Sequence, residues 1–217
     1  MNILKIFFQF EFLQLAKVKQ KIFSNILYFF IFLSIIQILT QNFPSDLKFN
    51  ISILAVFIAI LSSLISINQN VFDEDFRDGT LEQILIHCQN LEIYIMAKLL
   101  TNWVSSVLII NILATVFIKM NFAIDLSWLK LLSIFLIQSL ALNFLLGWSS
   151  ALCLERNLSV IASIVAVPLT LPIFILSSVA IIENFNNNIL LLLALASLTT
   201  IISILACAKI INIVAKN

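Results

Sequence analysis

Glycine is almost missing from this sequence, which has only Gly79 and Gly147 in 217 residues. A Walker A loop or a dinucleotide-binding fingerprint needs several closely spaced glycines, so the chain carries neither. Charge is scarce as well: 11% of the residues are charged, against about 25% in soluble domains. With 62% hydrophobic residues and a net charge of +1, the composition excludes a water-soluble globule and gives no electrostatic support for nucleic-acid binding.

Residues that support catalysis or bind metals are also few. The single histidine, His87, has no second histidine and no nucleophile–base set, so it forms neither a catalytic triad nor a metal site by itself. The cysteines, Cys88, Cys153 and Cys207, have no CxxC or other metal-ligand spacing. We expect them to act as small apolar side chains, and we expect no catalytic residue and no metal site.

Long apolar runs are what the sequence has in abundance. About 20 mainly apolar residues cross the core of a bilayer as a helix, and six runs reach that length without a charge. The sequence therefore predicts one all-α integral membrane domain, residues 1–217, with six transmembrane helices. The expected helices cover residues 22–39, 51–68, 99–118, 131–152, 158–181 and 189–210.

The distribution of lysine and arginine predicts the direction of these helices, because basic residues accumulate on the cytoplasmic side. With the N-terminus inside, nine of them fall on inner segments and three, Lys48, Lys119 and Lys130, on outer segments. Both termini are therefore expected in the cytoplasm, or in the matrix of a mitochondrion. Residues 1–21 precede the first helix and fit either an interfacial amphipathic helix or a basic topology anchor.

No acidic, basic or histidine residue lies in the middle of an expected transmembrane helix. Ion-coupled transporters and pumps normally carry ionisable residues there, so the energy for any transport is expected to come from a partner protein. The polar residues Gln37, Asn111, Gln138 and Asn143 are expected to form hydrogen bonds between helices.

The segment between the second and third helices, residues 69–98, is the charged part of the chain and the expected cytoplasmic loop. It holds six of the eleven acidic residues. Asp73 and Arg77 are four residues apart, which is a favourable spacing for an ion pair in a helix. Asp78 and Gly79 together are a turn signal. We therefore expect an acidic lead-in with a turn at Asp78 and Gly79.

A short helix is predicted directly after this turn. Thr80 followed by Gln83 is a capping-box pattern, and Glu82 in the first turn complements the helix dipole. The helix would carry an apolar stripe made of Leu81, Ile84, Leu85 and Cys88. A cap and a stripe favour a small helix that docks beneath the membrane, and the alternative is a solvated charged loop.

The fifth expected helix contains two prolines four residues apart, Pro168 and Pro172. Each proline removes a backbone donor and clashes with the carbonyl four residues before it, which frees the carbonyls of Ile164 and Pro168. Thr170 between them is expected to help satisfy the gap. A kink or a break should result. It would act as a flexing point or as part of a central pathway, or only as a fixed structural kink.

Two of these segments carry a resemblance to a known family. The pattern Phe-x-x-Asp-x-x-Asp-Gly-x-Leu-Glu-Gln resembles that of the haem exporter protein B family, CcmB. The matching positions are Phe72, Asp75, Asp78, Gly79, Leu81, Glu82 and Gln83. The run Pro-Leu-Thr-Leu-Pro at residues 168–172 is similar to the fifth helix of that family. Length and six-helix organisation agree over nearly the whole chain.

This resemblance implies an ABC-2-like permease, the membrane subunit of an ATP-binding cassette complex for cytochrome c maturation that serves haem export or release of a haem-loaded chaperone. A CcmA-like ATPase would bind the ATP and dock on the cytoplasmic coupling helix, which includes Thr80. Further implied partners are CcmC-like and CcmD-like membrane subunits and a CcmE-like haem chaperone, with two copies of this chain or a paired membrane subunit. The chain would bind no cofactor directly, because haem is handled by the complex. The implied location is the bacterial or mitochondrial inner membrane.

Two other functions fit the same expected helices. An exporter permease for lipid, polysaccharide or drug would share the architecture and differ in cargo. An integral membrane enzyme or a structural assembly subunit is a different class, and the enzyme is disfavoured because the sequence shows no nucleophile–base or metal constellation. Haem iron is usually held by His, Cys, Met or Tyr. With His87 in the loop, we expect this chain to supply no axial ligand.

Overall fold

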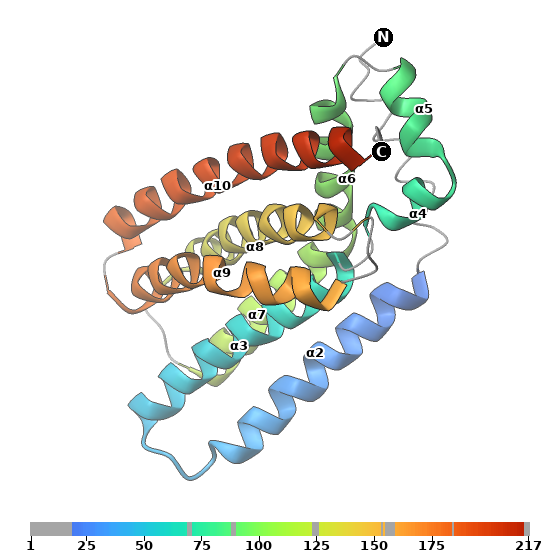
Figure 1. Ribbon diagram of the computed structural model, residues 1–217. Helices are drawn as coiled ribbons and strands as arrows, with labels where there is room; N and C mark the ends of the chain where they lie inside the picture. The colour runs from blue at the N-terminus through green and yellow to red at the C-terminus, as the bar shows by residue number, and fades with distance from the viewer. Residues whose placement is uncertain are drawn as a thin grey trace.

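The computed structural model describes residues 19–68, 71–87, 90–122, 126–152, 154, 159–183 and 185–214, and within these ranges all regular secondary structure is helical. The elements are α2 (Lys19–Leu39), α3 (Ser45–Asn68), α4 (Asp73–Arg77), α5 (Thr80–His87), α6 (Leu91–Asn102), the π-helical turn η2 (Trp103–Val107), α7 (Leu108–Asn121), α8 (Trp128–Ala151), α9 (Ser159–Ile182) and α10 (Phe185–Val214). Figure 1 shows the long helices as one bundle with the short helices α4 and α5 at one end.

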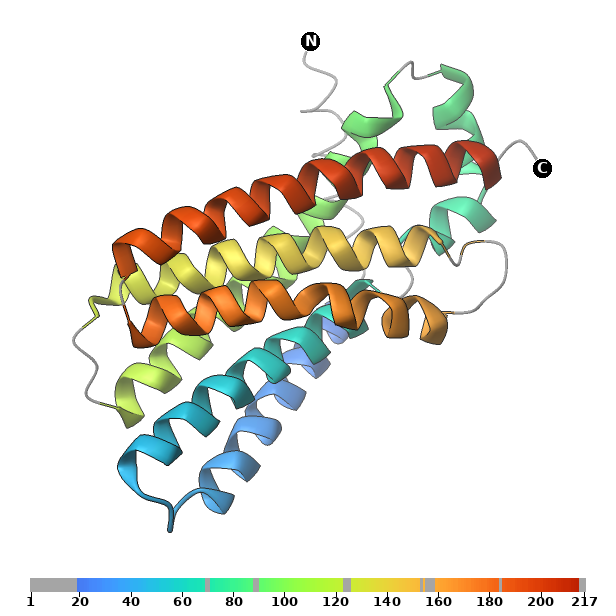
Figure 2. The ribbon, with the colours of Figure 1, turned by 60° about the vertical axis from the view of Figure 1, so that its left-hand side comes forward.

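The long helices pack side by side, and their connections gather at the two ends of the bundle. α8 contacts α9 and α10, and α2 lies along α3 (Figures 1 and 2). We call the end that carries α4, α5 and the last turn of α10 the loop end. The distal end is the opposite one, where α2 meets α3, where α7 ends and α8 begins, and where α9 ends and α10 begins. α2 begins and α10 ends at the loop end.

Four helical segments of the described residues are long and apolar enough to cross a membrane. They are Leu47–Arg77, Leu91–Asn121, Trp128–Ala151 and Phe185–Val214. α2 and α9 contribute the shorter apolar segments Asn25–Leu39 and Val167–Ile182. The predicted all-helical membrane fold is therefore confirmed, and a helix stands at each place where the sequence predicts a span. The number of crossings and their direction stay predictions.

The third predicted span begins earlier than expected. The sequence places its start at residue 99, but the helix runs from Leu91 to Asn121 and includes the π-helical turn. Residues 91–98, which we assigned to the loop, therefore belong to α6. This difference matters because it places Lys98 inside a helix. Of the predicted lead-in at residues 1–21, the part up to residue 18 lies outside the described residues.

Buried apolar side chains form two groups within the bundle. The larger group joins α2, α3, α7, α8, α9 and α10, and includes a contact between the Phe57 and Phe135 rings, whose centres lie 6.1 Å apart. The smaller group lies at the loop end and joins α5, α6, α8 and α10. Large apolar side chains also cover the outside of α2 and α10. An apolar exterior is what a lipid-facing surface requires.

Candidate functional site

The segment between α3 and α6 folds as two short helices joined by a turn, where the sequence predicts one short helix after an acidic lead-in. α4 covers Asp73–Arg77 and α5 begins at Thr80. Between them, Gly79 has a φ of 70°, in the left-handed region that favours glycine. The backbone N–H of Gln83 donates to the carbonyl of Gly79 at 3.2 Å. The predicted Asp78-Gly79 turn is thus confirmed.

The same hydrogen bond identifies Gly79 as the residue that starts the helix. Because its carbonyl accepts the first bond of α5, Gly79 occupies the N-cap position and Thr80 is the first residue inside. The capping-box pattern places the N-cap at Thr80, so the observed N-cap lies one residue earlier. The hydrogen bonds that the Thr80 and Gln83 side chains would make in a capping box stay a prediction. Glu82 lies in the first turn of α5, as predicted.

The apolar side chains of the loop are packed against three long helices. Phe72 and Leu81 are fully buried in the smaller apolar group, together with residues of α6, α8 and α10. Ile84 and Leu85 pack on this group and are partly buried. The apolar stripe of α5 is therefore confirmed for these positions, while Cys88 lies outside the described residues. Packing of this kind excludes a freely solvated loop.

Asp75 of α4 is buried, with only 5% of its surface exposed. The Tyr94 hydroxyl and the Lys98 ammonium, both on α6, donate to the same carboxylate oxygen of Asp75. Lys98 is buried as well, at 7% exposure. We call these three residues the loop-end triad. A buried charge is costly unless it is paired and hydrogen-bonded, so the triad holds α4 against α6 in one arrangement.

The triad was not predicted from the sequence, although one signal was present. Tyr94 and Lys98 are four residues apart and therefore share a face of a helix. A third helix that begins at Leu91 places Lys98 inside the helix, on the same face as Tyr94. A lysine on a buried face needs an acidic partner. The loop contains six acids; the family pattern marks Asp75 as one of its positions, but it does not say which residue pairs with it.

Several polar side chains of the loop are exposed. They are the acids Glu74, Asp78 and Glu82 and the carboxamide Gln83, whereas Asp73 is half-buried. The family pattern therefore splits into two sets. Its buried members are Phe72, Asp75 and Leu81, and its exposed members are Asp78, Glu82 and Gln83.

A second polar network lies deeper in the bundle and carries no charge. The Asn68 amide of α3 donates to Asn143 Oδ1 of α8 at 3.0 Å, and Asn143 donates to the carbonyl of Leu99 in α6 at 2.9 Å. Asn102 of α6 donates to Asn68 Oδ1 at 3.2 Å. We call Asn68, Asn102 and Asn143 the amide clamp, because they hold three helices together.

Next to the clamp, the π-helical turn is bonded to α8 through a single hydroxyl. Trp103 Nε1 and Asn111 Nδ2 both donate to Ser139 Oγ, at 3.0 and 2.7 Å. A π-helical turn inserts one extra residue into an α-helix and often marks a functional site. Here it separates α6, which contacts the loop, from α7, which does not share the triad.

The predicted polar contacts between helices are confirmed for three of the four residues. Gln37 donates to Asn121 Oδ1 at 2.8 Å, and Asn111 and Asn143 bond as described above. Gln138 is fully buried in α8, but within the described part of the chain neither of its amide atoms has a hydrogen-bond partner. For Gln138 the prediction is not confirmed.

The proline pair lies in a helix that is not interrupted. α9 runs through Pro168 and Pro172 from Ser159 to Ile182, so of the two predicted outcomes the break is excluded and the kink stays a prediction. Thr170 is buried and donates to the carbonyl of Val167 at 2.7 Å. That carbonyl is not one of those that the prolines free, so this hydroxyl does not fill the predicted gap. Both prolines are exposed on the outside of this single chain.

Among the described residues, no group of three or more His, Cys, Asp or Glu side chains could hold a metal ion. Cys207 is a buried free thiol within the apolar group at the loop end, as expected of a small apolar side chain. At the loop end, the arrangement is a packed pair of short helices with an exposed acidic face.

The long apolar helices define an integral membrane protein. A family model described as CcmB protein matches residues 1–214, and the chain therefore belongs to the CcmB family. A similar protein is the heme exporter protein B of Haemophilus influenzae, which is 27% identical over 142 residues. That alignment covers 60% of this chain and 59% of the relative.

Proposed function

We propose that this chain is the membrane subunit of an ATP-binding cassette complex that acts in haem transport for cytochrome c biogenesis. Its own role is mechanical: it receives the movement of a separate ATPase at α4 and α5 and passes it to the long helices. The proposal rests on family membership together with the loop-end geometry. The membrane would be the inner membrane of a bacterium or of a mitochondrion.

The single observation that carries the proposal is the division of the loop into a buried and an exposed set. A docking element has to be fixed on one side and accessible on the other. Phe72, Asp75 and Leu81 provide the fixed side, and Asp78, Glu82 and Gln83 provide the accessible side. A solvated loop would need neither a buried ion pair nor an apolar face.

The path of the movement follows the contacts of α6. A push on α5 reaches α4 through the Gly79 turn and reaches α6 through the loop-end triad. α6 is in turn bonded to α3 and α8 by the amide clamp. Coupling is carried by elements that move as bodies, and we propose that the loop and α6 form one such body.

The partners that this function needs are a CcmA-like ATPase, CcmC-like and CcmD-like membrane subunits and a CcmE-like haem chaperone. The paired arrangement of ABC permeases would require two copies of this chain or a second membrane subunit. ATP would be bound by the ATPase partner, and haem would be held by the other subunits. The chain itself would then neither hydrolyse ATP nor ligate haem iron.

The test replaces the exposed acids without touching the buried set. In the double variant Asp78→Lys, Glu82→Lys, we expect the chain to fold, because both side chains are exposed and surface changes usually alter stability by less than about 0.5 kcal/mol. We expect loss of co-purification with the ATPase, or loss of cytochrome c yield. A suitable control is Asn42→Lys, an exposed polar residue between α2 and α3 at the distal end.

Normal assembly together with normal cytochrome c yield in the double variant would contradict the proposed coupling. The haem part is tested separately by adding haem to the purified chain. An axially ligated spectrum that is lost in His87→Ala or Cys207→Ala would show that the chain ligates haem itself. Loss of another exported substance, with cytochromes c intact, would instead favour an exporter of lipid, polysaccharide or drug.

A further inference from the structure

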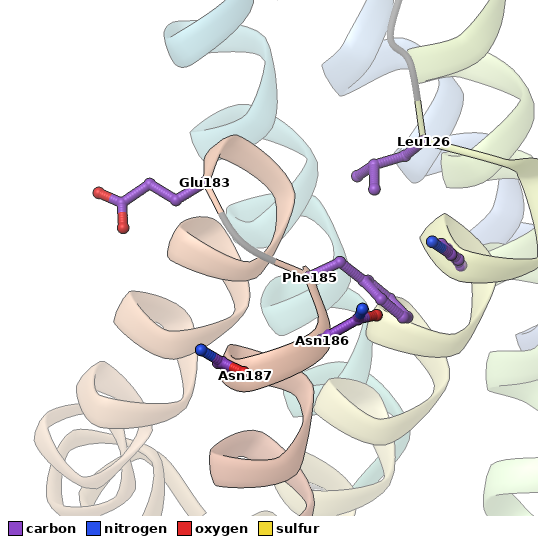
Figure 3. Close-up of a pocket in the computed structure, with 6 residues that line it drawn as sticks. Leu126, Glu183, Phe185, Asn186 and Asn187 are labelled. Carbon is purple, nitrogen blue, oxygen red and sulfur yellow. The ribbon is translucent and has the colours of Figure 1, made fainter.

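A pocket of about 390 Å³ lies at the distal end, far from the coupling loop. It is formed where α8 begins and α9 gives way to α10. Its lining consists of Leu126, Lys130, Glu183, Phe185, Asn186 and Asn187 (Figure 3). Its volume is within the range of small-molecule sites, and the function proposed above makes no use of it.

The polar groups on one side of the pocket suit an anion. The Lys130 ammonium lies 5.0 Å from the centre of the Phe185 ring, which fixes the position of the charge by a cation–π contact. An ammonium has three N–H donors, and the Asn186 carboxamide adds a further donor. Figure 3 shows Phe185 and Asn186 extending in the same direction from the first turn of α10.

Among the described residues that line the pocket, the only acidic one is Glu183, and it is turned away from this cation. Figure 3 shows the Glu183 side chain pointing to the opposite side from Phe185 and Asn186, and it is exposed. Its carboxylate therefore does not occupy the place beside Lys130. The first turn of α10 itself contains no acidic residue.

The surroundings of the pocket add an apolar requirement. Leu129, next to Lys130, is 78% exposed, and Leu190, one turn beyond Asn186 and Asn187 on α10, is 67% exposed. Trp128 at the start of α8 is also exposed, and tryptophan is enriched at membrane–water interfaces. The pocket thus lies at the boundary between the polar end of the bundle and its lipid-facing exterior.

We propose that this pocket binds the headgroup of a membrane phospholipid through its phosphate. The phosphate contacts Lys130 and Asn186, while the acyl chains run along the exposed leucines of α8 and α10. A soluble phosphate would use the first set of contacts and not the second. A neutral diacylglycerol would use the second and not the first.

The experiment measures lipid retention by native mass spectrometry of the purified full chain with added phosphatidylglycerol. We expect Lys130→Gln to weaken binding of the most tightly retained lipid about tenfold, which corresponds to about 1.4 kcal/mol. Asn186→Ala should weaken it less, and Lys130→Arg should retain it. Lys48→Gln is the matched control, because Lys48 is a distal-end lysine outside the pocket.

Two competitor arms identify the source of the phosphate. Diacylglycerol and glycerol 3-phosphate, each added alone at millimolar concentration, should leave the phospholipid bound. Displacement by glycerol 3-phosphate would identify a site for soluble anions, and displacement by diacylglycerol would show that the phosphate is not recognised. Either displacement would overturn the proposal. Equal lipid retention in Lys130→Gln and wild type would overturn it as well.

Discussion

Helix α6 is held by two polar networks that use opposite chemistry. At the loop end, the triad of Asp75, Tyr94 and Lys98 is built around an ion pair. Further along the helix, the amide clamp holds α6 to α3 and α8 with uncharged carboxamides only. Both networks are buried, yet only the one next to the loop contains formal charges.

This difference follows from where each network lies and from what it has to do. A charge far from water is costly in a bilayer, whereas carboxamides are tolerated because they can satisfy each other. The ion pair allows little movement, because separating Asp75 from Lys98 would leave two buried charges without partners. The triad therefore fixes one position of the loop, and the clamp permits small adjustments between helices.

The largest effect is expected from breaking the triad on one side. Asp75→Ala leaves Lys98 buried without its partner, and removing one member of a buried pair costs about 3–5 kcal/mol. Thermal unfolding of the purified chain in detergent measures this loss. The neighbouring exposed residue provides the control, because Glu74→Ala should change stability by less than about 0.5 kcal/mol.

A double substitution separates the charge from the packing. Asp75→Leu together with Lys98→Met removes both charges and keeps apolar volume, so most of the lost stability should return. The same double variant should still fail in coupling, because the directional contact between α4 and α6 is gone. Recovery of stability without recovery of cytochrome c yield would support the comparison, and recovery of both would contradict it.

A smaller effect is expected in the amide clamp. Asn143→Leu removes a hydrogen bond to Asn68 and another to the carbonyl of Leu99. Because hydrogen bonds between membrane helices average about 0.6 kcal/mol each, the free energy of unfolding should fall by about 1 kcal/mol. Asn50→Leu, at an exposed position of α3, is the control. A loss as large as that of Asp75→Ala would remove the distinction between the networks.

A substitution at Gly79 tests the turn between the two loop helices. Gly79→Ala meets no neighbouring atom within 4 Å, so crowding is excluded as a cause. Its cost is the left-handed backbone at a φ of 70°, about 1 kcal/mol. Gly79→Asn should cost less, because asparagine tolerates this conformation. Equal stability of wild type, Gly79→Ala and Gly79→Asn would contradict the assignment of strain to this turn.

Local features of the loop could be predicted because their causes are local. The Asp78-Gly79 pair and the polar start of α5 act over a few residues, and both are found where the sequence indicates them. The long apolar runs likewise predict the helices, because length and composition decide whether a segment can cross a bilayer. Gln37 and Asn143 were recognised for a similar reason, since a polar residue in an apolar run needs a partner.

The partners themselves could not be predicted, because they depend on how distant segments pack. Asp75 and Lys98 are 23 positions apart, and Asn68 and Asn143 are 75 positions apart. Periodicity also gave no hint of the π-helical turn at Trp103–Val107, which left the register of α6 and α7 open. At the proline pair, local rules predict a kink or a break without choosing between them, and α9 continues through both prolines without a break.

The central claim is that the loop and α6 move as one body when the ATPase binds ATP, and distances between spin labels test it most directly. Labels are placed on the exposed residues Glu74 of α4, Met96 of α6 and Met120 at the distal end of α7, in a chain without its native cysteines. In the assembled complex, ATP should leave the Glu74–Met96 distance unchanged and shift the Glu74–Met120 distance. A shift in the Glu74–Met96 distance, with Glu74–Met120 constant, would contradict the account.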